Sequence, residues 1–203
     1  RSVLAHVVIY VPVFIGLLPQ LTVTYTAFQN TNGVRFVDGY SLKSFASAMD
    51  KLSSSVRINL AFSLIAVLII VVLGTLIAYL SVRRHNMAVS ILDSLTMMPY
   101  IIPGSVMGIA LLMGFASKPI KLMGTAAIII LAYVLRRMPY TIRSASAILM
   151  NIHPSVEEAS MSLGASKLKT FIQITAPMMR GGVVSGAILS WMTIISELSA
   201  SVL

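Results

Sequence analysis

Long apolar runs alternate with short polar segments along the chain, and the length of each run decides whether it can cross a lipid bilayer. Residues 60–80 carry no charge and reach the roughly 20 residues that a helix needs to cross the hydrocarbon core. Residues 3–28 are apolar over a similar length. Both runs predict spanning helices, and the polar residues 30–57 between them predict an extramembrane connection with one short helix.

Prolines interrupt the third apolar run, which covers residues 91–115. Pro99 and Pro103 predict a kinked or broken helix, because proline lacks a backbone N–H and clashes with the preceding turn. A break of this kind can line a transport pathway, or it can serve only the packing of neighbouring helices, which the Gly104-x-x-x-Gly108 spacing would also allow. The pattern leaves both interpretations open.

Two arginines limit the fourth apolar run. Residues 122–135 are too few to cross a bilayer as a helix. We therefore expect Arg136 and Arg137 to reach the lipid headgroups, and the helix to continue over residues 140–148 along the membrane surface. Five spans are predicted in total, over residues 3–28, 58–81, 91–115, 121–142 and 179–203.

Composition places these helices in a membrane. Hydrophobic residues make up 57% and charged residues 10% of the chain, whereas soluble domains average about 25% charged residues. The predicted fold class is therefore an all-α, polytopic transmembrane helical bundle. The net charge of +9 indicates contact with anionic lipid headgroups and a positive-inside topology, and no nucleic-acid-binding motif competes with that interpretation.

One long polar stretch, residues 151–177, separates the last two apolar runs. Ser155 followed by Glu158 predicts the start of a helix, with the serine hydroxyl as its cap. Gly164 predicts the end of that helix, because glycine adopts the left-handed conformation of a C-cap without steric cost. A second helix is expected over residues 165–175, so that the stretch forms a helical hairpin at the membrane surface. Composition alone also allows an ordinary amphipathic helix at the bilayer interface.

The hairpin resembles the EAA loop of the permeases of bacterial ABC importers. That loop has the pattern E-A-A, three residues, G, nine residues and I-x-L-P, and the spacing in this chain fits it without a gap. The corresponding positions are Glu158, Ala159, Ser160, Gly164, Ile174 and Pro177. Two positions depart from the pattern, since Ser160 stands for the second alanine and Ala176 for the leucine.

The resemblance implies that the hairpin is a coupling helix that docks into a groove of a cytoplasmic ATPase, with Ser155 and Glu157 in the docking helix beside the positions above. Residues 137–143, with the sequence RMPYTIR, are also similar to the R-x-P-Y-x-x-R segment before the coupling loop of ferric-iron permeases. The core of that family continues with a further helix. We therefore expect a sixth span beyond Leu203, and the chain suits the second core of a fused permease.

Polar side chains mark one side of the last predicted helix. They recur at intervals of three and four residues, at Ser190, Thr193, Glu197 and Ser201. An acidic residue inside a membrane helix is a functional candidate, so this stripe is expected to line the translocation path together with Pro99 and Pro103. The alternative is that Glu197 extends to the outer headgroups.

Two further features of the last helix bear on its role. Residues 196–201 are similar to the same region of ferric-iron and organophosphonate permeases. The Gly182-x-x-x-Gly186 spacing predicts a face for tight packing against a neighbouring helix.

No catalytic motif is present in the sequence. It has no G-x-x-x-x-G-K-[ST] phosphate loop, no H-E-x-x-H zinc motif and no cysteine, and its three histidines are widely separated. We therefore predict a transport subunit without enzyme activity, cofactor or metal centre, which leaves ATP hydrolysis to another subunit.

Together with the resemblance, these features predict the permease subunit of a binding-protein-dependent ABC importer in the cell inner membrane. The implied partners are a cytoplasmic ATPase dimer, an external solute-binding protein, a second permease core and the lipid membrane, without nucleic acid. Ferric iron is the first expectation for the solute, followed by phosphonate, polyamine and sugar phosphate. A membrane anchor or sensor subunit that transports nothing is the contrasting hypothesis.

Overall fold

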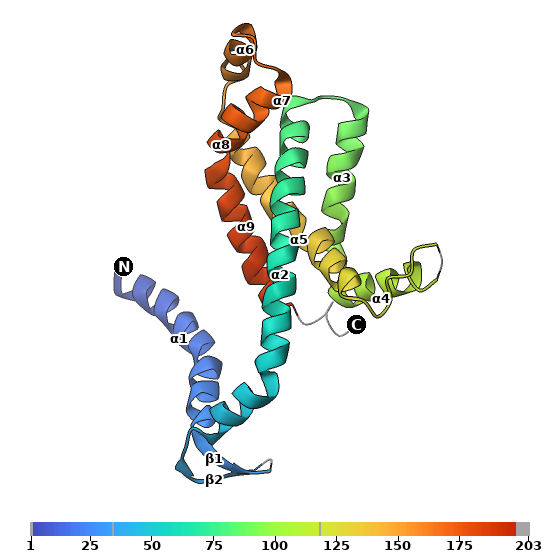
Figure 1. Ribbon diagram of the computed structural model, residues 1–203. Helices are drawn as coiled ribbons and strands as arrows, with labels where there is room; N and C mark the ends of the chain where they lie inside the picture. The colour runs from blue at the N-terminus through green and yellow to red at the C-terminus, as the bar shows by residue number, and fades with distance from the viewer. Residues whose placement is uncertain (1, 34, 118, 198–203) are drawn as a thin grey trace. The chain divides into compact units, whose positions relative to one another are not determined.

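The computed structural model describes residues 2–33, 35–117 and 119–197, which form helices and one short β-hairpin (Figure 1). The chain divides into two units, Arg1–Arg57 and Ile58–Leu203, each with its own internal contacts. The helical fold predicted from the sequence is confirmed. Within the described residues, the short β-hairpin is a feature that the sequence did not predict.

The N-terminal unit contains an apolar helix, the β-hairpin and the start of a long helix. α1 (Ser2–Ala27) covers the first predicted span. β1 (Gln29–Asn32) pairs antiparallel with β2 (Arg35–Tyr40), and Asn32 lies opposite Arg35. α2 (Lys43–Arg83) begins shortly after the hairpin.

The polar residues 30–57 therefore do not form the connection with one short helix that the sequence predicts. Strands occupy much of the first part, and residues 43–57 are the first part of α2, which continues unbroken into the apolar run. No proline interrupts residues 43–83, so nothing ends the helix at the edge of that run. The hairpin escapes prediction because its strands lack a clear alternation of apolar and polar residues.

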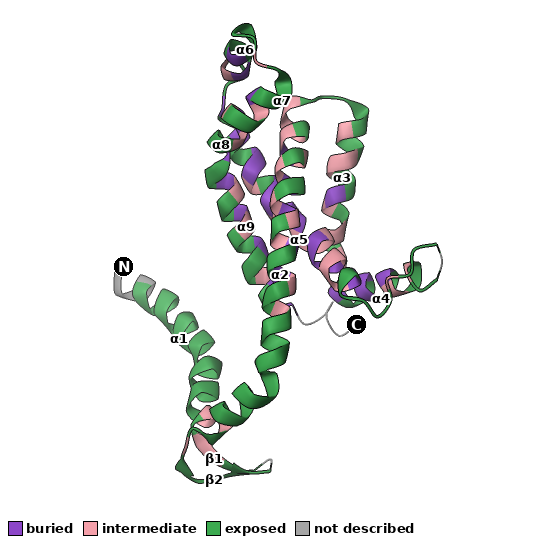
Figure 2. Cartoon of the chain, in the orientation of Figure 1, coloured by how far each residue is buried: buried purple, intermediate pink, exposed green. Residues whose placement is uncertain are grey.

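α5 (Ala126–Met150) is the central helix of the C-terminal unit (Figure 1). It packs most extensively on α9 (Arg180–Ile195), and it also contacts α3 (Met87–Ile101) and α4 (Gly104–Gly114). Figure 2 shows buried residues along α5 and α9. The largest fully buried side chains include Ile70 of α2, Ile142 and Leu149 of α5, and Ile194 of α9.

The third apolar run forms a bent pair of helices. Pro103 directly precedes α4, and the pair bends by 114° there, which confirms the predicted break. Pro99 lies inside α3 and does not end it. Met107 and Leu111 of α4 are buried in a cluster with Ile128 of α5. This contact agrees with the packing interpretation of the break, and a role in a pathway stays a prediction.

α5 continues through the region that the sequence assigns to the membrane surface. The helix is uninterrupted to Met150 and includes Pro139, so the predicted continuation over residues 140–148 is confirmed, and its position along the membrane surface stays a prediction. Three side chains of that region are fully buried, namely Thr141, Ile142 and Ala145. The apolar face of α5 thus extends beyond its arginines and keeps the helix inside the unit.

Two glycines of α9 let its backbone approach the backbone of α5. A Cβ atom added at Gly186 would lie 2.5 Å from the Cα of Thr141, and one added at Gly182 would overlap the carbonyl oxygen of Ser144. Neither approach is possible for a residue with a side chain unless the helices separate. The packing face predicted from the Gly182-x-x-x-Gly186 spacing is therefore confirmed.

Two helical segments of the described chain can cross a membrane by length and composition, residues 6–27 of α1 and the whole of α2. The number rises to four when each bent pair counts as one span, α3 with α4 and residues 167–178 with α9. α5 is long enough, but three arginines interrupt its apolar character. The count of five spans stays a prediction.

The packing of α9 on α5 can be tested by adding one methyl group. We expect Gly186→Ala to lower the free energy of unfolding by about 1–3 kcal/mol, because extra volume in a packed contact displaces its neighbours. Gly181→Ala is the matched control, since an added Cβ there meets no atom within 4 Å. It should be neutral or slightly stabilising, because alanine favours helix over glycine. Thermal unfolding of both variants in one detergent measures the difference, and equal transition temperatures would contradict the packing described.

Candidate functional site

α6 (Ser155–Ser162) is the first helix of the hairpin, and a histidine caps its start. The Nδ1 atom of His153 accepts a hydrogen bond from the backbone N–H of Ser155 at 3.2 Å, and it lies 2.8 Å from the Ser155 hydroxyl. The prediction that Ser155 caps this helix together with Glu158 is wrong. Pro154 occupies the cap position with a helical backbone, which moves the serine one residue into the helix.

The turn after α6 has the geometry predicted from Gly164. Its φ of +88° lies in the left-handed region that favours glycine. The N–H of Gly164 donates to the carbonyl of Met161 at 2.9 Å, and the N–H of Ala165 donates to the carbonyl of Ser160 at 3.2 Å. These two bonds form a Schellman motif, which satisfies carbonyls at the end of the helix.

The second half of the hairpin winds through three short helical segments. α7 (Lys167–Thr170) begins after Ser166, whose hydroxyl accepts a hydrogen bond from the backbone N–H of Lys169. A π-helical turn, η1 (Phe171–Thr175), and α8 (Ala176–Met178) follow.

Pro177 accounts for the π-helical turn before it. A proline ring clashes with the carbonyl four residues earlier, and a wider turn moves that carbonyl away. Ile174 is half-buried within the turn, and Pro177 itself is exposed. The chain then bends by 68° into α9.

A largely buried ion pair fastens α6 to α2. The Nε of Arg83 lies 2.9 Å from one carboxylate oxygen of Glu157, and the hydroxyl of Tyr79 donates to the other at 3.1 Å. Arg83 also donates from Nη2 to the backbone carbonyl of Ile152 at 2.8 Å. Glu157 is only 8% exposed, so its carboxylate faces α2 and anchors the hairpin.

The two halves of the hairpin are joined to each other and leave one surface open. The hydroxyls of Ser160 and Thr170 lie 2.9 Å apart, and both residues are buried. On the opposite side, Glu158 and Ala159 of α6 are exposed. Two leucines beyond α6, Leu163 and Leu168, are more than half exposed. The hairpin thus presents an apolar surface with one exposed glutamate, Glu158, and two exposed lysines, Lys167 and Lys169, that no described part of the chain covers.

Glu197, just after α9, is buried against two arginines of α5. Its carboxylate lies 2.9 Å from Nη1 of Arg136 and also pairs with Nη2 of Arg137. The expectation that both arginines reach the headgroups is therefore wrong, and so is the alternative that Glu197 extends outward. The carboxylate offsets part of the charge of the two arginines inside the unit, which costs less free energy than burying the charges without a partner.

The other residues predicted to line a path lie on two different parts of the unit. Ser190 is buried, and its hydroxyl donates to the backbone carbonyl of Arg137 at 3.0 Å, whereas Thr193 is half-buried. Ser201 lies outside the described residues. Pro99 and Pro103 belong to the bent pair of α3 and α4. The path stays a prediction.

The sequence interpretation missed the partners of the acidic residues. Arg83 and Tyr79 lie more than 70 positions before Glu157, and Asp93 pairs at 3.0 Å with Arg143, which lies 50 positions after it. The available signal was the presence of arginines at the ends and in the middle of otherwise apolar helices. Within the described ranges, no group of three or more His, Cys, Asp or Glu residues could hold a metal ion.

Comparison with known proteins connects these features to a family. A family model described as the binding-protein-dependent transport system inner membrane component matches residues 70–202. The ferric transport system permease protein FbpB of Actinobacillus pleuropneumoniae is 31% identical over 180 residues, which cover 89% of this chain and 25% of that protein.

Two further relatives are similar over shorter stretches. The putative ferric transport system permease protein FbpB 1 of Haemophilus influenzae is 34% identical over 127 residues, or 63% of this chain and 20% of that protein. The molybdate/tungstate transport system permease protein WtpB of Pyrococcus abyssi is 33% identical over 152 residues, or 75% of this chain and 58% of that protein. The chain thus spans about a quarter or less of the two ferric permeases and somewhat over half of the third relative.

The anchoring role of Glu157 can be separated from the surface role of its neighbour. We expect Glu157→Gln to lower the free energy of unfolding by about 3 kcal/mol, because it leaves the charge of Arg83 uncompensated in a largely buried place. Glu158→Gln makes the same chemical change on the exposed side and should cost within about 0.5 kcal/mol. Thermal unfolding, with the rate of proteolysis within residues 163–166 as a local readout, compares the two. An equal loss in both variants would show that the ion pair does not hold the hairpin.

Proposed function

We propose that this chain, which belongs to the family of binding-protein-dependent transport system inner membrane components, forms the membrane-spanning permease part of an ABC importer. The observation that carries the proposal is the hairpin over residues 155–177. It combines the spacing of the EAA loop with a left-handed glycine, an internal anchor and an exposed apolar surface that carries Glu158. A membrane anchor or sensor that transports nothing would not need this combination.

The exposed surface of the hairpin is the proposed contact for a cytoplasmic ATPase dimer. Glu158, Ala159 and Leu163 are available on α6 and the turn after it, while Glu157 and Ser160 hold the helix in place from the other side. Ser155 and Gly164 bound the docking helix, and Ile174 and Pro177 shape the return into α9. Each residue thus either touches the partner or fixes the geometry of contact.

Force from the ATPase would reach the membrane helices by two routes. One route is the Glu157–Arg83 ion pair, which connects α6 to the end of α2. The other is the backbone through η1 and α8 into α9, which packs tightly on α5. Rocking of these helices between two states would expose the solute path first to one side of the membrane and then to the other.

The names of the relatives support a proposal for the solute and the remaining partners. We propose ferric iron as the solute, delivered by an external binding protein, because the relative with the longest aligned stretch reported above is a ferric permease. An oxyanion is the second candidate, because a relative named for molybdate or tungstate matches three quarters of the chain. We assign to the solute path the residues Ser190, Thr193, Glu197, Ser201, Pro99 and Pro103. A second permease core would complete this path across the cell inner membrane.

The coupling role is tested by distorting the turn without touching the docking helix. A valine at Gly164 would have to adopt a positive φ, which a β-branched side chain strongly disfavours, and no atom lies within 4 Å of an added Cβ. The effect would therefore act through the backbone alone. We expect Gly164→Val to reduce solute uptake per ATP hydrolysed more than Glu158→Ala, which removes one exposed contact.

Reconstitution of each variant with its ATPase and binding protein gives this ratio. Gly164→Asn is the matched control, because asparagine tolerates positive φ, and it should retain most of the coupling. If Gly164→Val couples normally while Glu158→Ala does not, the shape of the turn is incidental to transport.

A further inference from the structure

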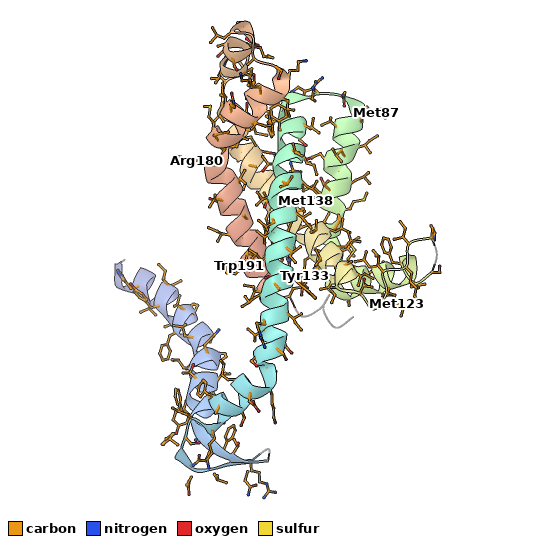
Figure 3. The ribbon with its side chains drawn as sticks, in the orientation of Figure 1. Met87, Met123, Tyr133, Met138, Arg180 and Trp191 are labelled. Atoms are coloured by element: carbon orange, nitrogen blue, oxygen red, sulfur yellow. The ribbon has the colours of Figure 1, made fainter. Side chains whose placement is uncertain are left out.

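A small cavity lies where α2 ends, α3 begins and α5 ends. Its volume is about 270 Å³, and its lining comes from residues 81–94 and from the last two turns of α5. Figure 1 shows the end of α2 and the start of α3 joined by a short loop, and Figure 3 marks that start with Met87. The cavity is distinct from the hairpin surface and from the Glu197 cluster, because it shares no residue with either.

Three helices each contribute a buried polar atom that has no hydrogen-bond partner, and all three of the residues line this cavity. The atoms are the hydroxyl oxygens of Ser81 and Ser146 and the Oδ1 oxygen of Asp93. Ser146 is only 4% exposed. Buried polar atoms in folded proteins nearly always have partners, so three such atoms around one space indicate a polar ligand.

The charged groups of the lining define the chemistry of that ligand. Arg84 and Arg143 are cationic, and His85 adds a nitrogen donor or acceptor. Arg143 donates from Nη2 to Oδ2 of Asp93 at 3.0 Å, which leaves Oδ1 of the same carboxylate unpaired. The lining therefore offers an excess of donors, which suits a phosphate, and one carboxylate oxygen, which suits an ammonium group.

The position of the cavity along α2 indicates where such a ligand would come from. The uncharged run of α2 ends at Val82, and Arg83 and Arg84 follow directly. Clusters of arginine at the end of a spanning run lie at the level of the lipid headgroups. A phosphate that carries an ammonium group is abundant at that level as the headgroup of a membrane lipid.

We propose that this cavity binds a phosphate ester that carries a primary ammonium group, as in the phosphoethanolamine headgroup of a lipid. The phosphate is held by Arg84 with the hydroxyls of Ser81 and Ser146, and the ammonium group by Oδ1 of Asp93. Such a ligand connects α2, α3 and α5 at the end where Arg83 of α2 also anchors the hairpin. It would stabilise this end of the unit against separation of α3, whose contact there includes the exposed Asp93–Arg143 ion pair.

The first test measures binding of four probes to the whole chain purified in a detergent without phosphate. Dihexanoyl phosphatidylethanolamine should bind most tightly, and dihexanoyl phosphatidylglycerol and inorganic phosphate should bind at least tenfold more weakly because they lack the ammonium group. Soluble O-phosphoethanolamine distinguishes the source. If it matches the lipid, a free ester can fill the site, and if it binds only weakly, the ligand is a lipid. Either result supports the site, whereas equal affinity for the ethanolamine lipid and phosphatidylglycerol would overturn it.

Three variants of the lining test the assignment of each group. Ser146→Ala removes a hydroxyl that has no partner in the protein, so it should leave the unfolding temperature unchanged and weaken binding by roughly fivefold, the value of one hydrogen bond. Arg84→Gln should weaken binding by about tenfold or more, since it removes a charged donor. The control Arg180→Gln changes an exposed arginine outside the cavity and should have no effect.

Asp93→Asn tests the role of Asp93 in ligand selectivity, which would not change if Asp93 only stabilised the fold. It should abolish the preference for the ethanolamine lipid over phosphatidylglycerol, whatever it does to the stability of the chain. A preference retained in Asp93→Asn, or an unchanged affinity in both Ser146→Ala and Arg84→Gln, would overturn the proposal. Because no probe here requires transport, failure of this site would leave the proposed permease function unaffected.

Discussion

The close contact between α5 and α9 is the constraint on which the rest of the C-terminal unit depends. Gly182 and Gly186 remove the side chains that would otherwise separate these helices, and the backbones meet near Thr141 and Ser144. Lipid offers no hydrophobic gain from helix association, so contact of this kind must come from close packing and polar bonds. The hydroxyl of Ser190 adds such a bond by donating to the carbonyl of Arg137.

Buried ion pairs then fix how the helices align lengthwise. Glu197 reaches Arg136 and Arg137 only if α9 is placed on α5 with one particular offset, and Glu157 reaches Arg83 only if α6 lies at the end of α2. A shift of either helix by one turn, about 5.4 Å, would leave a charge buried without a partner. That penalty amounts to several kcal/mol and exceeds the small gain of the pair itself, so these pairs select an arrangement more than they stabilise it.

Features that depend on neighbouring residues could be predicted from the sequence, and features that depend on distant partners could not. The break at Pro103, the left-handed Gly164 and the packing glycines of α9 each follow from the conformation or size of a single residue type. The burial of Arg136 and Arg137 did not, because these arginines suggest a membrane surface until Glu197, some 60 residues later, is known to pair with them.

The hairpin, over about 25 residues, also combines features that could be predicted from the sequence with features that could not. Its turn was predictable, but its N-terminal cap was not, because Ser155 and His153 can both supply a cap and the backbone of Pro154 decides between them. The π-helical turn also follows from Pro177 only after the helix is known to continue through that residue.

The attachments of the hairpin to α9 and to α2 differ in kind, and that difference suits them to different tasks. α8 joins α9 through the backbone, so the hairpin stays connected to α9 whatever its side chains are. α6 joins α2 through one carboxylate, and its orientation therefore depends on Arg83 and Tyr79 holding Glu157. Covalent connection fixes where the hairpin is attached, and the ion pair fixes which way its exposed surface faces. A partner that binds this surface, as proposed, would therefore be connected to α2 through the ion pair and to α9 through the backbone.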